Sequence, residues 1–204
     1  GEGLRNTITL LGRGRGGHGR MHWSANFDEV QDFEHDARTM FGGLGFIADA
    51  ELAVGTRGLP LGDPKSGLAP ELDALAAYVA SLTEIPRSPY RNPDGTLTQE
   101  GIAGEAIFQR FNCDACHNGA MYTDSAQGLL HDIGGMKATS GQRLGLPLLG
   151  LDTPSLVGLW LSAPYLHDGT AATLEDVLTG QQFPAGAHGD IASFLLDNPP
   201  ALEQ

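Results

Sequence analysis

Apolar residues recur at helical spacing in several stretches of the chain. The clearest stretch follows Pro70, where apolar side chains three or four residues apart occur at Leu72, Leu75, Val79 and Leu82. Proline fits the first turn of a helix and ends a helix further along, so Pro70 and Pro86 bracket this pattern. The sequence therefore predicts an amphipathic helix that begins at Pro70 and ends before Pro86.

Other stretches predict helices with weaker patterns. Ser24 is a good N-cap, and the apolar positions after it predict a helix that continues to about Met40. Thr173, followed three residues later by Asp176, is close to a capping box and predicts a short helix. Further helices are predicted near 47–54 and over about 98–111 and 190–196. Most of the remaining chain, including residues 118–152, is predicted to be irregular.

A proline-rich connector divides the chain. Residues 86–95 contain three prolines together with Asn92, Asp94 and Gly95, a composition typical of turns. The 204 residues are enough for one large domain or two small ones. We therefore expect two domains, which cover residues 1–88 and 97–204.

The strongest chemical signal is the run Cys113-Asp114-Ala115-Cys116-His117. This is C-x-x-C-H, the pattern through which haem c is attached to a protein chain. The two thiols can form thioethers with the haem vinyl groups, and the adjacent histidine can bind the iron as its proximal ligand. The sequence thus predicts one covalent haem c at Cys113 and Cys116, with His117 on the iron.

The alternatives to haem are a redox dithiol, a disulfide and half of a zinc site. A structural zinc site needs four ligands, and the chain has no second pair of cysteines. A thioredoxin-type motif needs a βαβ pattern around it, and the sequence shows none. Covalent haem is therefore the favoured interpretation.

Composition limits which binding partners and which cellular compartment we expect. The 29 glycines and 12 prolines indicate much loop, and the net charge of −13 argues against nucleic acid and leaves a basic protein partner open. No apolar run is long enough for a membrane helix. Because haem attachment through this motif occurs outside the bacterial cytoplasm, we expect a periplasmic or secreted protein. Its leader would have been removed, or more chain would lie upstream of Gly1.

After the haem motif, the chain resembles a known family. Three runs occur in order, at Asp152–Leu156, Ala163–Gly169 and Thr173–Val177, and together they resemble the C-terminal haem domain of bacterial di-haem cytochrome c peroxidases and MauG-like enzymes. The similarity spans about residues 98–196. Val157-Gly158 stands where that family usually has Arg-Asn, so the resemblance does not define a catalytic subtype.

A weak internal repeat suggests what the first part of the chain is. The runs at 6–12, 21–23 and 28–30 parallel those at 152–158, 166–168 and 175–177 in order and approximate spacing. The predicted fold class is therefore mainly α. A cytochrome c-like haem domain would follow a partial cytochrome c-like domain that carries no haem motif of its own.

The sixth iron ligand is the least certain part of the predicted site. The chain offers a set of methionines and histidines at Met121, Met136, His18, His22, His35, His131, His167 and His188. The resembling family places a distal methionine or tyrosine just before the closing helix, but neither residue type follows His167 here. We therefore expect His188, 71 residues after His117, to bind the iron, with Met136 as the alternative. If Met136 is the ligand, His188 is an ordinary surface histidine.

Other residues receive weaker assignments. The resemblance places His167 near the haem without making it the resting ligand, and the alternative is a core histidine bonded to backbone. It also implies a calcium ion between the domains, held by backbone carbonyls near Ser162 and Pro164. Arg143 could neutralise a haem propionate or be solvated. Trp23 and Trp160 could lie between haems or belong to the core.

Three functions fit these features. The first is a c-type cytochrome that transfers electrons through one haem to or from a redox protein partner. The second is peroxidase or MauG-like oxidase activity as part of a larger di-haem enzyme. The third is a sensor or structural module. We favour electron transfer within a di-haem-peroxidase-like ancestry, and we expect the partial first domain to associate with a second copy or with a missing upstream segment.

Overall fold

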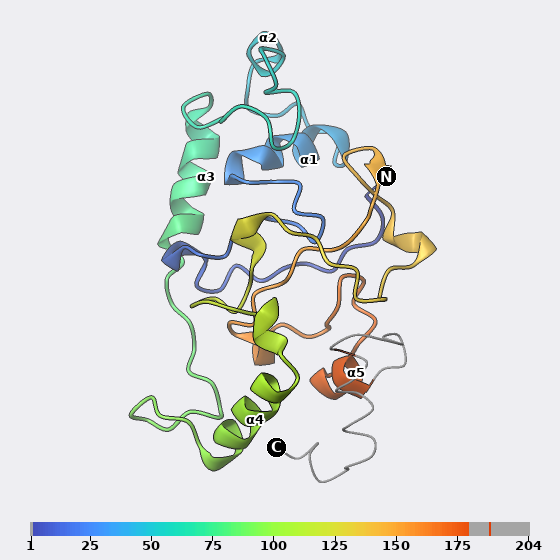
Figure 1. Ribbon diagram of the computed structural model, residues 1–204. Coiled ribbons are helices and arrows are strands. Elements are labelled where there is room, and N and C mark those ends of the chain that lie inside the picture. Colours follow the sequence, from blue (N-terminus) through green and yellow to red (C-terminus); the bar gives the residue numbers. More distant parts are fainter. Residues whose placement is uncertain (1, 180–187, 189–204) are drawn as a thin grey trace.

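The computed structural model describes residues 2–179 and His188, and short helices in it are joined by long irregular segments (Figure 1). The α-helices of the described residues are α1 (Phe33–Thr39), α2 (Asp49–Leu52), α3 (Pro70–Ser81), α4 (Gln99–Arg110) and α5 (Leu174–Thr179). The strands β1 (Gln142–Arg143) and β2 (Leu146–Pro147) form a small antiparallel pair. Helices α1 to α3 lie at one end of the molecule, and α4 and α5 lie at the other.

Helix α3 confirms the clearest sequence pattern. It begins at Pro70 and ends at Ser81, where Leu82 leaves the helical conformation with ψ 75°. Leu72 and Val79 are buried, and Leu72 packs with Ile47 and Ala69 in an apolar cluster.

The 3₁₀ turn Arg13–Arg15 packs against the other end of α3. Gly14 permits this close approach, because a Cβ there would lie 2.1 Å from the carbonyl oxygen of Ala80. The turn and the helix are therefore held backbone to backbone.

The helix predicted from Ser24 is shorter than expected. Residues 21–27 form a turn closed by a bridge between Met21 and Phe27, and α1 begins only at Phe33. The Ser24 hydroxyl donates to the Asn26 side chain at 3.0 Å, a local bond that competes with helix formation. Ser24 is therefore part of the turn and does not cap a helix.

The later helices follow the sequence expectation where they are described. Thr98 caps α4 by accepting a hydrogen bond from the amide of Gly101 at 3.2 Å. Thr173 and Asp176 bond each other's amides at the start of α5, as in a capping box. The predicted helix over 190–196 lies outside the described residues.

The N-terminal segment packs directly on the part of the chain that carries the haem motif. The amide of Leu4 donates to the carbonyl of Thr139 at 3.1 Å, and the amide of Arg20 donates to the Ser125 hydroxyl at 2.9 Å. Arg143 donates from Nε to the carbonyl of Ser24 at 2.6 Å. Residues 2–27 and 123–171 are thus interleaved.

Two turns far apart in the sequence share one backbone geometry. The first is bridged between Met21 and Phe27 and the second between Tyr165 and Ala171. In each turn the second and fifth residues have positive φ: 65° and 49° at His22 and Ala25, 68° and 70° at Leu166 and Gly169. Each turn is followed, five residues after its end, by an aspartate that caps a helical turn, Asp32 and Asp176.

The segments before these turns also match. Gly12 and Gly158 each precede a 3₁₀ turn with left-handed φ of 66° and 70°, and this match pairs Asn6 with Asp152. The amide of Asn6 donates to the carbonyl of His167 at 2.6 Å, and the amide of Asp152 donates to the carbonyl of Trp23 at 2.7 Å. Such reciprocal bonds between matching residues are typical of two-fold symmetry. This geometry matches His167 with Trp23, one residue away from the alignment that the sequence suggested.

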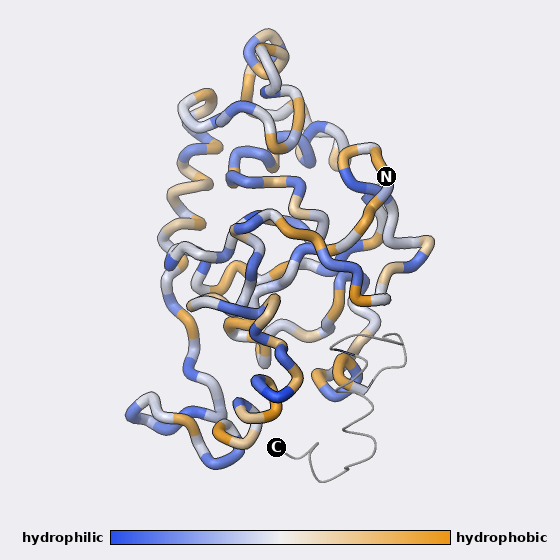
Figure 2. The backbone as a smooth tube through the Cα atoms, viewed as in Figure 1, coloured by the Kyte–Doolittle hydropathy of each residue, from blue (hydrophilic) through white to orange (hydrophobic). Residues whose placement is uncertain are grey.

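Burial differs between the two ends of the molecule. The described apolar cluster of Ile47, Ala69 and Leu72 lies beside α3. Helices α4 and α5 carry apolar stretches (Figure 2), yet neither helix buries a residue. Within the described residues, every helix falls short of the length and apolarity needed to cross a membrane.

Candidate haem site

The haem motif forms one tight turn at the end of α4. Asn112 takes the left-handed conformation with φ 55°, which asparagine tolerates well, and a 3₁₀ turn follows at Cys113–Ala115. The amide of His117 donates to the carbonyl of Cys113 at 2.9 Å. Both cysteines are free thiols and half-buried. Local backbone geometry thus brings two thiols and one imidazole together.

His117 is oriented by a backbone carbonyl. Its Nδ1 lies 3.1 Å from the carbonyl oxygen of Tyr122, and the backbone of Pro154 also hydrogen-bonds the ring. Burial lowers the pKa of His117, although the hydrogen bonds to Tyr122 and Pro154 oppose the shift. A lowered pKa favours the neutral imidazole, the form that ligates iron.

His188 lies within electrostatic range of His117. Burial, together with the charge of His117, lowers the pKa of His188 to about 4. Two histidines 71 residues apart in the sequence are thus brought near each other. Met136, the alternative ligand, is half-buried on the segment before the 3₁₀ turn Ala138–Ser140.

The residues present fit haem c. Two thiols, the imidazole of His117 and a second imidazole at His188 are the donors that a six-coordinate haem c uses. The ring of Phe108 on α4 lies edge-on to Tyr122, with 6.3 Å between centroids. Since α4 buries none of its residues, an apolar surface next to the motif is open to a porphyrin. Bound there, haem would supply one-electron redox chemistry at the iron.

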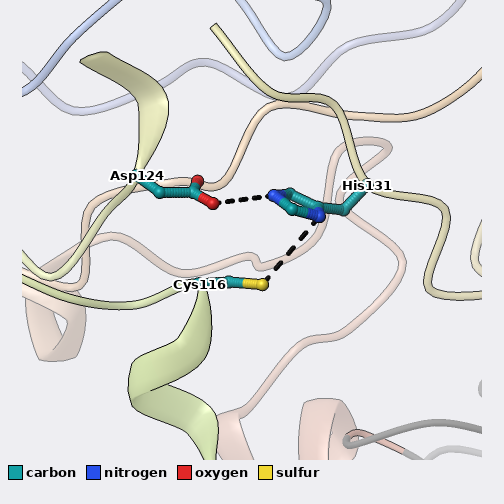
Figure 3. A group of neighbouring side chains, drawn as sticks. All are labelled: Cys116, Asp124 and His131. Carbon is teal, nitrogen blue, oxygen red and sulfur yellow. Dashed lines mark hydrogen bonds and ion pairs between the residues drawn. The ribbon is translucent and has the colours of Figure 1, made fainter. Parts of the chain in front are cut away.

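A further group of side chains surrounds Cys116 (Figure 3). Its Sγ lies 3.9 Å from Nδ1 of His131, and Nε2 of His131 lies 2.8 Å from Oδ2 of Asp124. One ligand atom from each residue lies within 4.8 Å of the others. The imidazole hydrogen-bonds both the sulfur and the carboxylate, and the three side chains converge on one another (Figure 3). Burial and the charge of Asp124 raise the pKa of the Cys116 thiol.

Sequence reasoning included His131 only as one of several iron ligands and missed Asp124. The sequence does place a cysteine, an aspartate and a histidine within sixteen residues, and only this closeness could have suggested the group. It is a weak signal, because the order of such residues in a sequence does not determine whether they meet in space.

His167 is buried and hydrogen-bonded. Its Nε2 lies 2.8 Å from the Ser140 hydroxyl, and its ring lies edge-on to Trp23 with 6.4 Å between centroids. Trp23 in turn donates from Nε1 to the carbonyl of Asn6 at 3.0 Å. The imidazole of His167 is thus hydrogen-bonded to a side chain, whereas the alternative interpretation expected a bond to a backbone group.

Arg143 and Pro164 both form hydrogen bonds between the two interleaved segments. Arg143 donates to the carbonyls of Ser24 and Ala25, and burial lowers the pKa of its guanidinium. The carbonyl of Pro164, expected near a calcium ion, accepts a hydrogen bond from the side chain of Asn6. A propionate contact of Arg143 and the calcium ion both stay predictions.

Histidines of the first segment serve local contacts. His18 lies 3.0 Å from the carbonyl of Gly12 through Nε2. His22 lies between the side chains of Asn26 and Asp36, at 3.0 and 3.4 Å.

Comparisons with known proteins agree with this site. A family model described as RoxA-like, cytochrome c-like, matches residues 150–186. The chain is 30% identical over 155 residues to hydrazine synthase subunit gamma of Kuenenia stuttgartiensis, a match that covers 58% of this chain and 43% of the relative. It is 32% identical over 91 residues to the methylamine utilization protein MauG of Methylophilus methylotrophus, which covers 40% and 26%. The chain is related to the MauG-like di-haem cytochromes.

A solved MauG-like protein associated with microbial copper homeostasis has the same fold. It aligns with 90% of this chain and 62% of its own length, with a TM-score of 0.56 and 19% identity. The family resemblance seen in the sequence is confirmed, as is a cytochrome c-like fold built from helices with little sheet. The cytochrome c-like match and these relatives support a redox function based on haem. The chain spans less than half the length of the two curated MauG-like and hydrazine synthase relatives it matches.

Proposed function

We propose that this chain is a c-type cytochrome that transfers electrons through one covalently bound haem. The observation that carries the proposal is the turn at Cys113–His117, which brings two thiols and the imidazole of His117 together. His117 would hold the iron, and the carbonyl of Tyr122 fixes the ring so that little reorganisation would accompany a change of iron charge.

His188 is proposed as the sixth ligand. Support comes from the influence of His117 on its pKa, which requires the two imidazoles to be near each other. A second strong ligand closes the iron to exogenous molecules and favours electron transfer over peroxide chemistry.

Residues 1–88 are proposed to be the rear part of a second cytochrome c-like domain, beside the haem domain at 97–204. The matching turns at Met21–Phe27 and Tyr165–Ala171 support this proposal, as do the reciprocal bonds of Asn6 and Asp152. Trp23 and His167 face each other where these two segments meet, so this contact would lie between two haems if the first domain were complete.

The alternative function is peroxidase or MauG-like oxidase activity within a larger di-haem enzyme. The similarity to the methylamine utilization protein MauG and to a subunit of hydrazine synthase favours it, because the second name denotes part of an enzyme. In that case this haem would be the electron-transferring half, and a second haem would lie in the completed first domain.

Partners and compartment follow from the same proposal. A redox protein with a basic docking face would suit the net charge of −13. A second copy or an upstream segment would complete the first domain. A haem c protein of this kind would be periplasmic or secreted.

Covalent attachment is the decisive test. The protein should be produced in a host that attaches haem c, and its intact mass should exceed that of the chain by one haem. The red colour should stay with the protein in acidified acetone. Haem that extracts completely would contradict the proposal, and the Cys113→Ala, Cys116→Ala double variant provides the control for non-covalent binding.

A further inference from the structure

The ring of His117 is held by backbone groups from two separate segments. Its Nδ1 lies 3.1 Å from the carbonyl oxygen of Tyr122. The backbone of Pro154, which has a carbonyl but no amide hydrogen, also hydrogen-bonds the ring. An imidazole that binds a metal through one nitrogen keeps its remaining N–H, which can only donate, and both carbonyls are suitable acceptors. The residues that fix these two carbonyls therefore control the orientation of the ring.

Two side-chain hydroxyls join the segments that carry these carbonyls. Ser155 Oγ donates to the carbonyl of Met121 at 2.7 Å, and Thr123 Oγ1 donates to the carbonyl of Thr153 at 2.5 Å. Each bonded residue is the direct chain neighbour of one of the two residues whose carbonyls bond the ring. The two bonds run in opposite directions between the segments, so each of these carbonyls lies between two fixed neighbours.

The direction of both hydroxyl bonds is fixed by a second contact. The oxygen of Thr123 accepts from the amide of Ser125 at 3.1 Å, and that of Ser155 accepts from the amide of Val157 at 3.2 Å. An amide can only donate, so each hydroxyl uses a lone pair locally and directs its own proton to the opposite segment. Thr123 and Thr153 are both buried, so water does not compete for the bond between them.

We propose that Thr123 and Ser155 are positioning residues that set the reduction potential of the haem through His117. The inference rests on the proposed covalent haem with His117 on its iron. A firm hydrogen bond from the imidazole N–H to a carbonyl makes the ring a more basic ligand, and a more basic ligand stabilises ferric iron over ferrous iron. The two hydroxyls keep the carbonyls aligned with the ring and therefore hold the potential low.

The experiment measures the reduction potential of the haem-loaded chain by optical titration with redox mediators. The variants are Ser155→Ala and Thr123→Val, alone and combined, which remove the hydroxyls and keep most of the side-chain volume. Ser155→Thr and Thr123→Ser are conservative variants that keep a hydroxyl at each position. The matched control is Ser81→Ala, because Ser81 Oγ also donates to a carbonyl at 2.7 Å, that of Tyr78 on α3. Intact mass confirms one haem in each protein.

We expect the combined variant to weaken the preference of the haem for the ferric state about tenfold, which is a rise of about 59 mV for a one-electron couple. Each single variant should raise the potential by less. The conservative variants and Ser81→Ala should keep the potential of the unmodified chain. The sign separates this role from a merely structural one, because a loosened turn admits water, which stabilises the extra charge of ferric iron and lowers the potential.

The other outcomes separate the inference from the proposed function. An unmodified chain that carries no covalent haem would contradict the proposed function and the inference with it. If the haem is attached, an unchanged or lowered potential in the combined variant, or an equal rise in Ser81→Ala, would overturn the inference alone. If the combined variant does not retain haem, the single variants decide: a rise that the conservative variant does not show supports the inference, and an unchanged potential in both overturns it.

Discussion

Single residues with unusual backbone conformations shape the haem turn. Asn112 and Tyr122 both have positive φ, at 55° and 51°. Asn112 reverses the chain after α4 so that Cys113 begins a new turn. Tyr122 turns its carbonyl toward His117, where it accepts the Nδ1 proton. A positive φ is costly for a tyrosine, and here it accompanies the contact of the Tyr122 carbonyl with Nδ1 of His117.

His188 can be tested by removing its imidazole. In the haem-loaded protein, His188→Ala should convert low-spin iron to a high-spin form that binds added ligands such as cyanide or azide, because the sixth position is opened. The optical spectrum and electron paramagnetic resonance measure the change. Met136→Ala is the control and should leave the spectrum unaltered. A near-infrared methionine–iron band in the unmodified protein would transfer the assignment to Met136.

At the scale of elements, α3 and α4 are stabilised in different ways. Helix α3 buries Leu72 and Val79 against protein, within an apolar cluster that the chain supplies. Helix α4 has a capped start and the same length of 12 residues, but it buries nothing. A helix of that length is marginal in water without tertiary packing. Helix α4 therefore needs a further packing surface, which the proposed haem would provide.

The contribution of α3 can be measured with two leucines on the same helix. Leu72→Ala should lower the free energy of unfolding by about 2–5 kcal/mol, because Leu72 is 2% exposed and its loss leaves a cavity beside Ile47 and Ala69. Leu75→Ala should cost less than about 0.5 kcal/mol, since Leu75 is 42% exposed. Urea unfolding of the haem-loaded variants gives both values. Equal losses would show that the cluster does not hold α3.

At the scale of the whole molecule, the two matched segments meet where Asn6 bonds His167 and Asp152 bonds Trp23. At this point the amide of Asp152 is bonded to the carbonyl of Trp23, and its carboxylate accepts the Ser125 hydroxyl at 2.6 Å. Burial raises the pKa of Asp152 to about 7, and the charge of Asp124 adds to the rise, while the Ser125 bond, Arg20 and Arg13 oppose it.

This buried carboxyl predicts a pH dependence of stability. The folded chain holds the Asp152 proton more tightly than the unfolded chain, whose pKa is 3.8. The contribution of Asp152 to stability is therefore fully present below that value and is lost as the pH rises toward about 7, by at most about 1.4 kcal/mol per pH unit. Asp152→Asn should remove the pH dependence that this carboxyl contributes. The unfolding midpoint of the variant should therefore rise, relative to that of the unmodified chain, as the pH increases. Parallel curves would contradict the prediction.

The sequence by itself determined the features that depend on neighbours along the chain. The spacing of Cys113, Cys116 and His117 defines a haem c motif because two thioethers and one ligand must reach one porphyrin. Helices α3 and α4 were predictable from Pro70, the cap at Thr98 and helical spacing, all of which act within a few residues. The helix expected from Ser24 does not form there, because the bridge from Met21 to Phe27 and the hydrogen bond from Ser24 to Glu2 hold this segment in a turn. Local helix propensity does not include such contacts, so the sequence pattern alone could not exclude the helix.

Only the tertiary structure decided which distant residues meet. His188 comes near His117 across 71 residues, and Asp124 meets His131 and Cys116 through turns that no periodic pattern predicts. The internal repeat was visible in the sequence, but its register was set by bridges and left-handed turns, which match His167 with Trp23. Backbone hydrogen bonds between segments more than a hundred residues apart, those of Asn6 with His167 and of Asp152 with Trp23, hold the two matched segments together. Their partners are chosen by the fold as a whole rather than by the residues on either side.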